Sequence, residues 1–143
     1  MKIIKVALIT FALFLVSINA QNINKIDLAK TSANKLFDFC KVNNFEKAAD
    51  LIAYSGKDAE RNLNSSFNFK VASEANTVKR ISKKIKAFLD ISDTYEFGKF
   101  EEKTEENIKT YYLEVEFISG NQRLKTIFSL VEVKGKMLLS ELN

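Results

Sequence analysis

The sequence lacks the residues on which several common enzyme chemistries depend. The 143-residue chain contains no His, no Trp and no Pro, and it has one Cys and four Gly. Without His there is no Ser-His-Asp triad, no Cys-His pair and no HExxH zinc site. A single Cys excludes an intrachain disulfide, and four Gly leave no room for a Gly-rich phosphate-binding loop. The sequence therefore points to no catalytic residue set, no cofactor and no metal.

The N-terminus has the three-part pattern of a secretory signal peptide. A head with two lysines precedes an apolar stretch, residues 6–16, and residues 17–20 read Ser-Ile-Asn-Ala. The small side chain of Ala20 and the aliphatic residue two positions before it fit a cleavage site. The apolar stretch falls short of the ~20 residues that span a bilayer, so we expect no stable membrane anchor. We expect residues 1–20 to be a signal peptide cleaved after Ala20, and the protein to be secreted or periplasmic.

Residues 21–143 have the size and composition of a single domain. No internal repeat, low-complexity tract or Gly-rich linker divides them. They carry 20 basic and 18 acidic residues, a net charge of +2 that is too small by itself to indicate a polyanionic partner. Ten Phe and four Tyr remain after the signal peptide, and we expect them to supply much of the core.

The hydrophobic period changes once along this domain. In the first half, apolar residues recur at steps of three and four, which predicts helices over residues 24–41, from Phe45 toward Gly56, and over residues 71–89. From Thr94 onward they alternate, which predicts strands over residues 95–103, 109–119, 123–133 and 136–142. Three N-terminal helices packed on a curved antiparallel sheet of about four strands make an α+β fold.

Two segments carry a resemblance to a known family. The first two predicted helices are linked by Asn43-Asn44-Phe45-Glu46-Lys47-Ala48, and the last predicted hairpin reads FSLVEVKGKM over residues 128–137. With this order of elements, the chain resembles the small secreted bacterial members of the NTF2-like superfamily, which fold as a cystatin-like α+β cone. Met137 stands where those proteins usually have Trp. The resemblance implies a pocket between the concave sheet and the helices, which members use to bind small molecules, use for catalysis or simply fill.

Tyr95, Tyr111 and Tyr112 together with Asp93 are the best candidates for a polar ligand-binding pocket, and Asp90 is a further candidate. A Tyr hydroxyl donates a hydrogen bond, and a desolvated Asp can serve in acid–base chemistry. In the alternative interpretation, the two Asp residues end a helix and start a turn, while the Tyr rings pack in cross-strand pairs. Without His or a recognisable geometry, the structural interpretation is favoured.

Five cations lie on one side of the predicted third helix: Lys79, Arg80, Lys83, Lys84 and Lys86. Such a basic face can contact lipid headgroups, polysaccharide or nucleic acid. The favoured alternative is a solvated face, whose charge would be neutralised in the fold by the acidic residues that follow: Glu101, Glu102, Glu105 and Glu106. Secretion removes most nucleic-acid partners, so none is expected.

The single thiol, Cys40, falls on the apolar side of the first predicted helix. Free Cys behaves as a small hydrophobic residue in protein cores, so we expect an unreactive thiol. The alternative is an intermolecular disulfide.

These observations predict a non-catalytic binding domain, secreted or periplasmic, for a small apolar or amphipathic ligand or for a protein partner, a homodimer included. A first alternative is an isomerase- or hydrolase-type enzyme that uses Asp93 or Asp90 with a Tyr donor. A second is an envelope-interacting protein that acts through the basic helix face. An interior ligand requires a pocket lined by Phe and Tyr, and a space filled by side chains would argue against it.

Overall fold

The computed structural model describes residues 24–143, which have the α+β order that the sequence predicts. The predicted signal peptide lies outside the described residues. Within them, three helices come first: residues 24–41, α2 (Phe45–Ala49) and α3 (Ala72–Asp90). Four strands follow: β1 (Thr94–Glu105), β2 (Ile108–Ser119), β3 (Gln122–Val133) and β4 (Lys136–Leu142). The predicted helix over residues 24–41 is confirmed, and each strand agrees with its predicted range to within about two residues.

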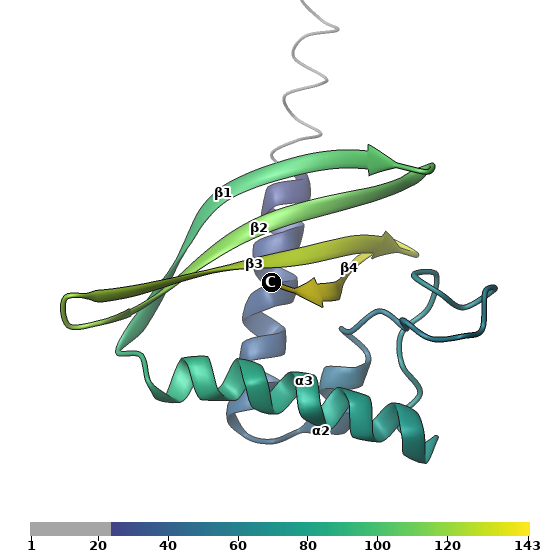
Figure 1. The fold of residues 1–143 in the computed structure, drawn as a ribbon, viewed down its shortest axis with the longest axis horizontal. Helices are drawn as coiled ribbons and strands as arrows, with labels where there is room; N and C mark the ends of the chain where they lie inside the picture. Colours follow the sequence, from purple (N-terminus) through teal and green to yellow (C-terminus); the bar gives the residue numbers. More distant parts are fainter. Residues whose placement is uncertain (1–23) are drawn as a thin grey trace, which may run out of the picture.

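The strands form a curved, unclosed antiparallel sheet in the order β1-β2-β3-β4 (Figure 1). Tight turns join neighbouring strands. At the β3–β4 turn, Lys134 and Gly135 both have positive φ, as a two-residue type I′ turn requires. The hairpin of β2 and β3 extends beyond the start of β1 and the end of α3, on the left of Figure 1.

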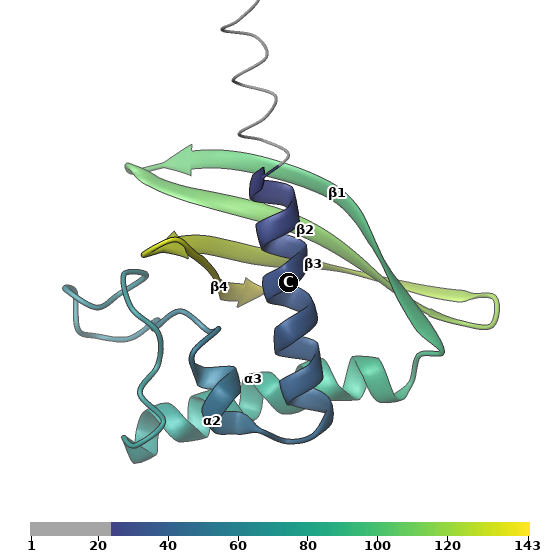
Figure 2. The same cartoon turned by 180° about the vertical axis from the view of Figure 1, so that it is seen from behind.

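The inner face of the sheet, which we define as the side facing the helices, is covered by the helix of residues 24–41 (Figure 2). Phe37 of this helix is fully buried against it. Its ring centroid lies 5.0 Å from that of Tyr95, 5.4 Å from that of Phe128 and 6.0 Å from that of Phe117. These rings come from three different strands, so aromatic side chains occupy the centre of the space between sheet and helices.

The second helix is shorter than its sequence pattern predicted. It ends at Ala49, and Ile52 leaves the helix to form a parallel bridge with Leu139 on the outer edge of β4. The backbone N–H of Ala53 donates to the carbonyl of Leu139 at 2.8 Å. The extension toward Gly56 is therefore wrong, because these residues instead satisfy the backbone groups of an edge strand.

The segment from residue 54 to residue 71 packs in part against the outer face of the sheet, the side away from the helices. Leu63 lies there against a small cluster that includes Val131, Val133 and Leu138. These three residues alternate along their strands with side chains of the inner face, which places them on the opposite side. Leu63 has a φ of 56°, in the left-handed region that Leu seldom adopts, and its N–H donates to the Tyr54 carbonyl at 2.9 Å.

Candidate functional site

The three Tyr residues singled out in the sequence do not converge on one pocket. Tyr111 and Tyr112 are adjacent in β2, so their side chains lie on opposite faces of the sheet. Tyr111 is buried on the inner face and stacks on Phe100 at 5.9 Å. Tyr95 pairs in register with Phe117, six positions from Tyr111 along β2, or about 20 Å at the usual rise per residue.

Each Tyr side chain instead contacts its own neighbours in the fold. The Tyr95 hydroxyl lies 2.9 Å from Asn34 Oδ1, to which it can donate a hydrogen bond. Burial raises the pKa of Tyr95 and that of Tyr111, so both hydroxyls stay protonated near neutral pH. Tyr112 lies on the outer face, where Lys103 Nζ sits 5.1 Å from its ring centroid. Cross-strand packing accounts for these positions.

The two Asp candidates lie at or just after the end of α3, where each carboxylate has a partner within the chain. Asp93 Oδ2 accepts a hydrogen bond at 2.9 Å from the backbone N–H of Gly120, in the β2–β3 turn. Asp90 Oδ1 lies 3.0 Å from Lys86 Nζ, one helical turn earlier. The Asp93 bond links the start of β1 to the projecting hairpin, so both carboxylates have contacts that fit the structural interpretation.

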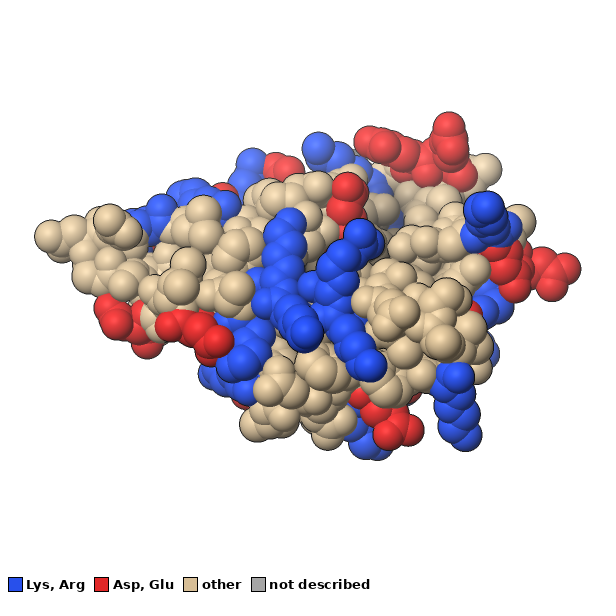
Figure 3. Space-filling model, turned by 60° about the horizontal axis from the view of Figure 1, so that its bottom comes forward, with Lys and Arg blue, Asp and Glu red and all other residues tan. Residues whose placement is uncertain are grey.

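The basic face of α3 lacks the acidic partners that the sequence suggested. Glu101 pairs with Lys99 on its own strand, and Glu102 pairs with Lys109 at 2.6 Å. The predicted neutralisation is wrong, because β1 carries these residues away from α3 toward the far end of the sheet (Figure 1). Figure 3 shows the resulting blue side chains crossing this side of the molecule.

The five cations of this face differ in their contacts. Lys86 pairs with Asp90, Lys79 Nζ lies 5.7 Å from the centroid of Phe69, and Lys84 Nζ donates to the Leu142 carbonyl at 3.4 Å. Within residues 24–143, no ion pair joins an acidic side chain to Arg80 or Lys83. The centre of the basic face is therefore exposed and uncompensated.

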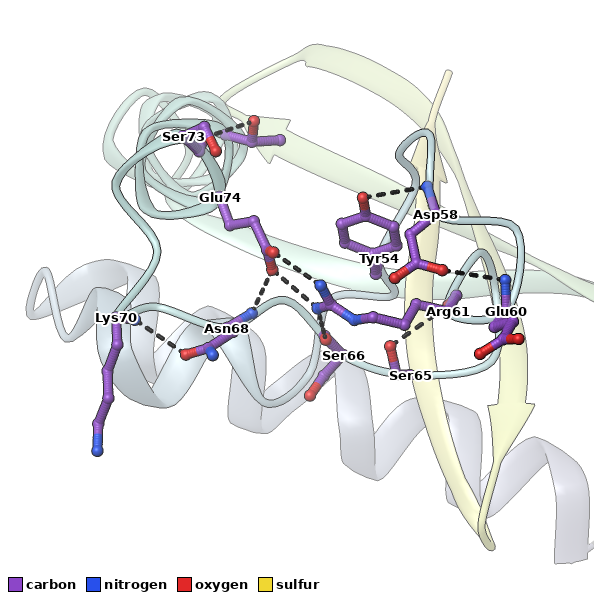
Figure 4. A network of polar contacts seen from close by, with 11 residues as sticks. Tyr54, Asp58, Glu60, Arg61, Ser65, Ser66, Asn68, Lys70, Ser73 and Glu74 are labelled. Atoms are coloured by element: carbon purple, nitrogen blue, oxygen red, sulfur yellow. Dashed lines mark hydrogen bonds and ion pairs between the residues drawn. The ribbon is translucent and has the colours of Figure 1, made fainter.

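A polar network that the sequence did not reveal joins the segment 54–71 to the start of α3 (Figure 4). The Arg61 guanidinium donates to both oxygens of Glu74, at 2.8 and 2.9 Å, and lies 4.1 Å from the Tyr54 ring centroid. Glu74 Oε2 also accepts from the backbone N–H of Asn68 at 2.6 Å. The hydrogen bonds from Arg61 lower the pKa of Glu74. Because these bonds are internal, the network organises the fold.

Two grooves flank Leu63, one at the end of the sheet that holds the β1–β2 and β3–β4 turns and one on the outer face. One has a volume of about 550 Å³, and its lining includes Asn62, Asn64, Asn107 and Lys134. The other has a volume of about 410 Å³, and its lining includes Ser55, Thr110, Tyr112, Ser129 and Ser140. Among the described residues, the buried Ser129 Oγ has no hydrogen-bond partner. Of the predicted site residues, Tyr112 and Tyr111 contribute to the walls of these grooves, Tyr111 to the first and Tyr112 to the second.

No protein-family model matches the chain, and no curated protein matches it.

Over residues 24–143, the structure has no helix that is both long and apolar enough to cross a membrane. In the same part of the chain, no three Cys, Asp or Glu side chains are grouped so that they could hold a metal ion.

Cys40 is fully buried, and the structure predicts that its thiol is unreactive in the native protein. Burial raises its pKa from 9.0 to about 11. The thiolate fraction near pH 8 therefore falls about a hundredfold relative to an ordinary thiol. We expect iodoacetamide to modify the native chain at least about a hundredfold more slowly than the urea-unfolded chain, as followed by mass spectrometry. Similar rates in the two states would contradict the burial of this residue.

Proposed function

We propose that the chain is a secreted or periplasmic, non-catalytic binding domain with the NTF2-like cone as its fold. We further propose that it binds a protein partner through the grooves beside Leu63. The observation that carries the choice of partner is the filled inner space, where Phe37 contacts rings from three strands. This packing favours surface binding over a small ligand held between sheet and helices.

The grooves beside Leu63 have the chemistry of a protein-binding surface. Their walls combine amide and hydroxyl groups, which can hydrogen-bond to a partner's backbone, with the ring of Tyr112 and the partly exposed Ile108. Tyr is enriched at the centres of protein interfaces because its ring buries area at a small entropic cost. Leu63 lies on both walls, so a partner that fills the two grooves would cover one continuous surface.

The same geometry supports binding over catalysis. An isomerase or hydrolase of the expected type needs an Asp and a Tyr donor close to one substrate. Asp93 accepts a bond from a backbone N–H instead, and Tyr95 and Tyr111 lie about 20 Å apart along the sheet.

Site-specific photo-crosslinking in the producing cell tests this proposal. A photoreactive residue in place of Asn62 or Tyr112 is expected to give the same discrete adduct, identified by mass spectrometry. The same residue in place of Lys35, exposed on the helix of residues 24–41, is the matched control and is expected to give none. An adduct with a second copy of the chain would identify the partner as a homodimer. Absence of any adduct at the groove positions, or equal adducts at the control, would contradict the proposal.

Two further measurements complete this test. With the partner in hand, Tyr112→Ala is expected to weaken binding by at least about tenfold, because a groove-lining aromatic residue is a typical hot spot. An unchanged thermal midpoint would show that the variant is folded. Native mass spectrometry of the protein isolated from the producing cell distinguishes a protein partner from a small-molecule ligand. An extra mass that is released on denaturation would favour a bound small molecule.

A further inference from the structure

The outward side of α3 is a cationic surface centred on Arg80, Lys83 and Lys84. These side chains are exposed, whereas Val78, Ser82 and Ile85 of the same helix are buried. Lys79 and Lys86 flank them, so all five cations fall within about 10 Å of helix length. This span is close to one Debye length at physiological salt, so the charges act together on an approaching anion.

An exposed aliphatic side chain lies beside these cations. Ile91, directly after α3, is 65 % exposed and stands at helical spacing from Arg80 and Lys84, which puts the three on one side.

The pairing of cations with an exposed aliphatic group distinguishes between two classes of anionic partner. A soluble polyanion needs only the cations and gives no reason to expose Ile91 beside them. An anionic bilayer offers phosphate groups for Lys and Arg, and an apolar layer just beneath them for aliphatic side chains. We propose that this side of α3 docks reversibly on an anionic lipid bilayer.

In this arrangement α3 keeps its place in the fold. Its apolar side packs in the core, so docking leaves the helix attached and brings only its outward side chains to the headgroups. Arg80, Lys83 and Lys84 contact lipid phosphates, while Ile91 enters the boundary of the apolar layer. The surface is separate from the grooves beside Leu63, so a membrane-docked protein could still present those grooves to a partner.

Vesicle co-sedimentation tests this proposal with the protein as the producing cell releases it. We expect binding to phosphatidylcholine vesicles that contain phosphatidylglycerol, no binding to pure phosphatidylcholine, and a steep loss of binding with added NaCl. The triple variant Arg80→Gln, Lys83→Gln, Lys84→Gln is expected to lose about a hundredfold in affinity, or about fivefold for each charge. The control triple variant Lys57→Gln, Lys99→Gln, Lys103→Gln makes the same change in net charge on other surfaces. It is expected to stay within about threefold of the original protein.

Ile91→Ser separates a bilayer from a soluble polyanion. Because it removes an apolar side chain and no charge, it is expected to weaken vesicle binding about tenfold and leave binding to inorganic polyphosphate unchanged. The proposal is overturned if phosphatidylglycerol vesicles do not bind, or if the two triple variants lose affinity equally. It is also overturned, in favour of a soluble polyanion, if Ile91→Ser leaves vesicle binding intact. None of these outcomes depends on crosslinking at the grooves, so the two proposals can fail separately.

Discussion

Replacing Phe37 with Ala is expected to lower the free energy of unfolding by about 4 kcal/mol. The Phe37 side chain is fully buried and contacts rings of β1, β2 and β3. Removing it leaves a cavity at the centre of the core, where neighbouring strands and helices limit the collapse of the site. Urea unfolding followed by far-UV circular dichroism measures the change.

Two matched variants make this result specific to the centre of the core. Phe39→Ala removes a half-buried ring from the same helix and is expected to cost about 1.5 kcal/mol. Phe37→Leu keeps most of the volume and is expected to cost about 1–2 kcal/mol. A loss for Phe37→Ala no larger than that for Phe39→Ala would show that the inner space is not filled as described.

The same variant bears on the proposed function. If Phe37 occupies the place of a ligand, the cavity in Phe37→Ala should bind a small aromatic compound such as benzene and recover part of the lost stability. The unaltered protein should show no such stabilisation. Stabilisation of both proteins by the same compound would favour the interior ligand that the sequence also allowed.

The elements with a clear hydrophobic period could be predicted from the sequence. The helix over residues 24–41 follows a repeat of apolar residues at steps of three and four, and the strands β2, β3 and β4 follow alternation. Tertiary contacts reinforce both patterns. Ile52 shows where this reasoning stops. Its spacing from Ala48 and Ala49 is typical of a helix. In the structure, however, Ile52 forms a β-bridge with Leu139 at the open edge of β4, far along the chain. The hydrophobic pattern around a residue does not show that a distant contact will override its helical preference.

The candidate site was harder to predict because its geometry depends on contacts between distant residues. Strict alternation places Tyr111 and Tyr112 on opposite faces, so that part could be read from the sequence. In β1, however, an irregularity between Phe97 and Phe100 shifts the register, and both rings pack toward the core. Glu101 pairs with a residue of its own strand and Glu102 with a residue of β2, although both follow α3 closely in the sequence. Proximity along the chain was therefore a poor guide to charge compensation.

The ion pair of Arg61 and Glu74 gave no sequence signal, and its loss is expected to have the second-largest effect on stability. Glu74 is 8 % exposed and accepts three hydrogen bonds, from the Arg61 guanidinium and the Asn68 backbone. Glu74→Gln removes the charge and disrupts this bonding, and we expect the free energy of unfolding to fall by about 2 kcal/mol near pH 7. The partial exposure of Arg61 keeps the loss below that of a fully buried pair.

The pH dependence of this loss identifies the carboxylate as its source. The pKa of Glu74 in the folded protein lies below its ordinary value of 4.5. Its contribution to stability is therefore complete above about pH 4.5 and disappears as the pH falls through the lower folded-state pKa. We expect the difference in unfolding free energy between the original protein and Glu74→Gln to be constant near neutrality and to shrink in acid. Glu60→Gln, a change at an exposed carboxylate of the same segment, is the matched control and should leave stability unchanged throughout. A difference for Glu74→Gln that persists unchanged to pH 3 would mean that the side chain stabilises the fold by packing rather than through its charge.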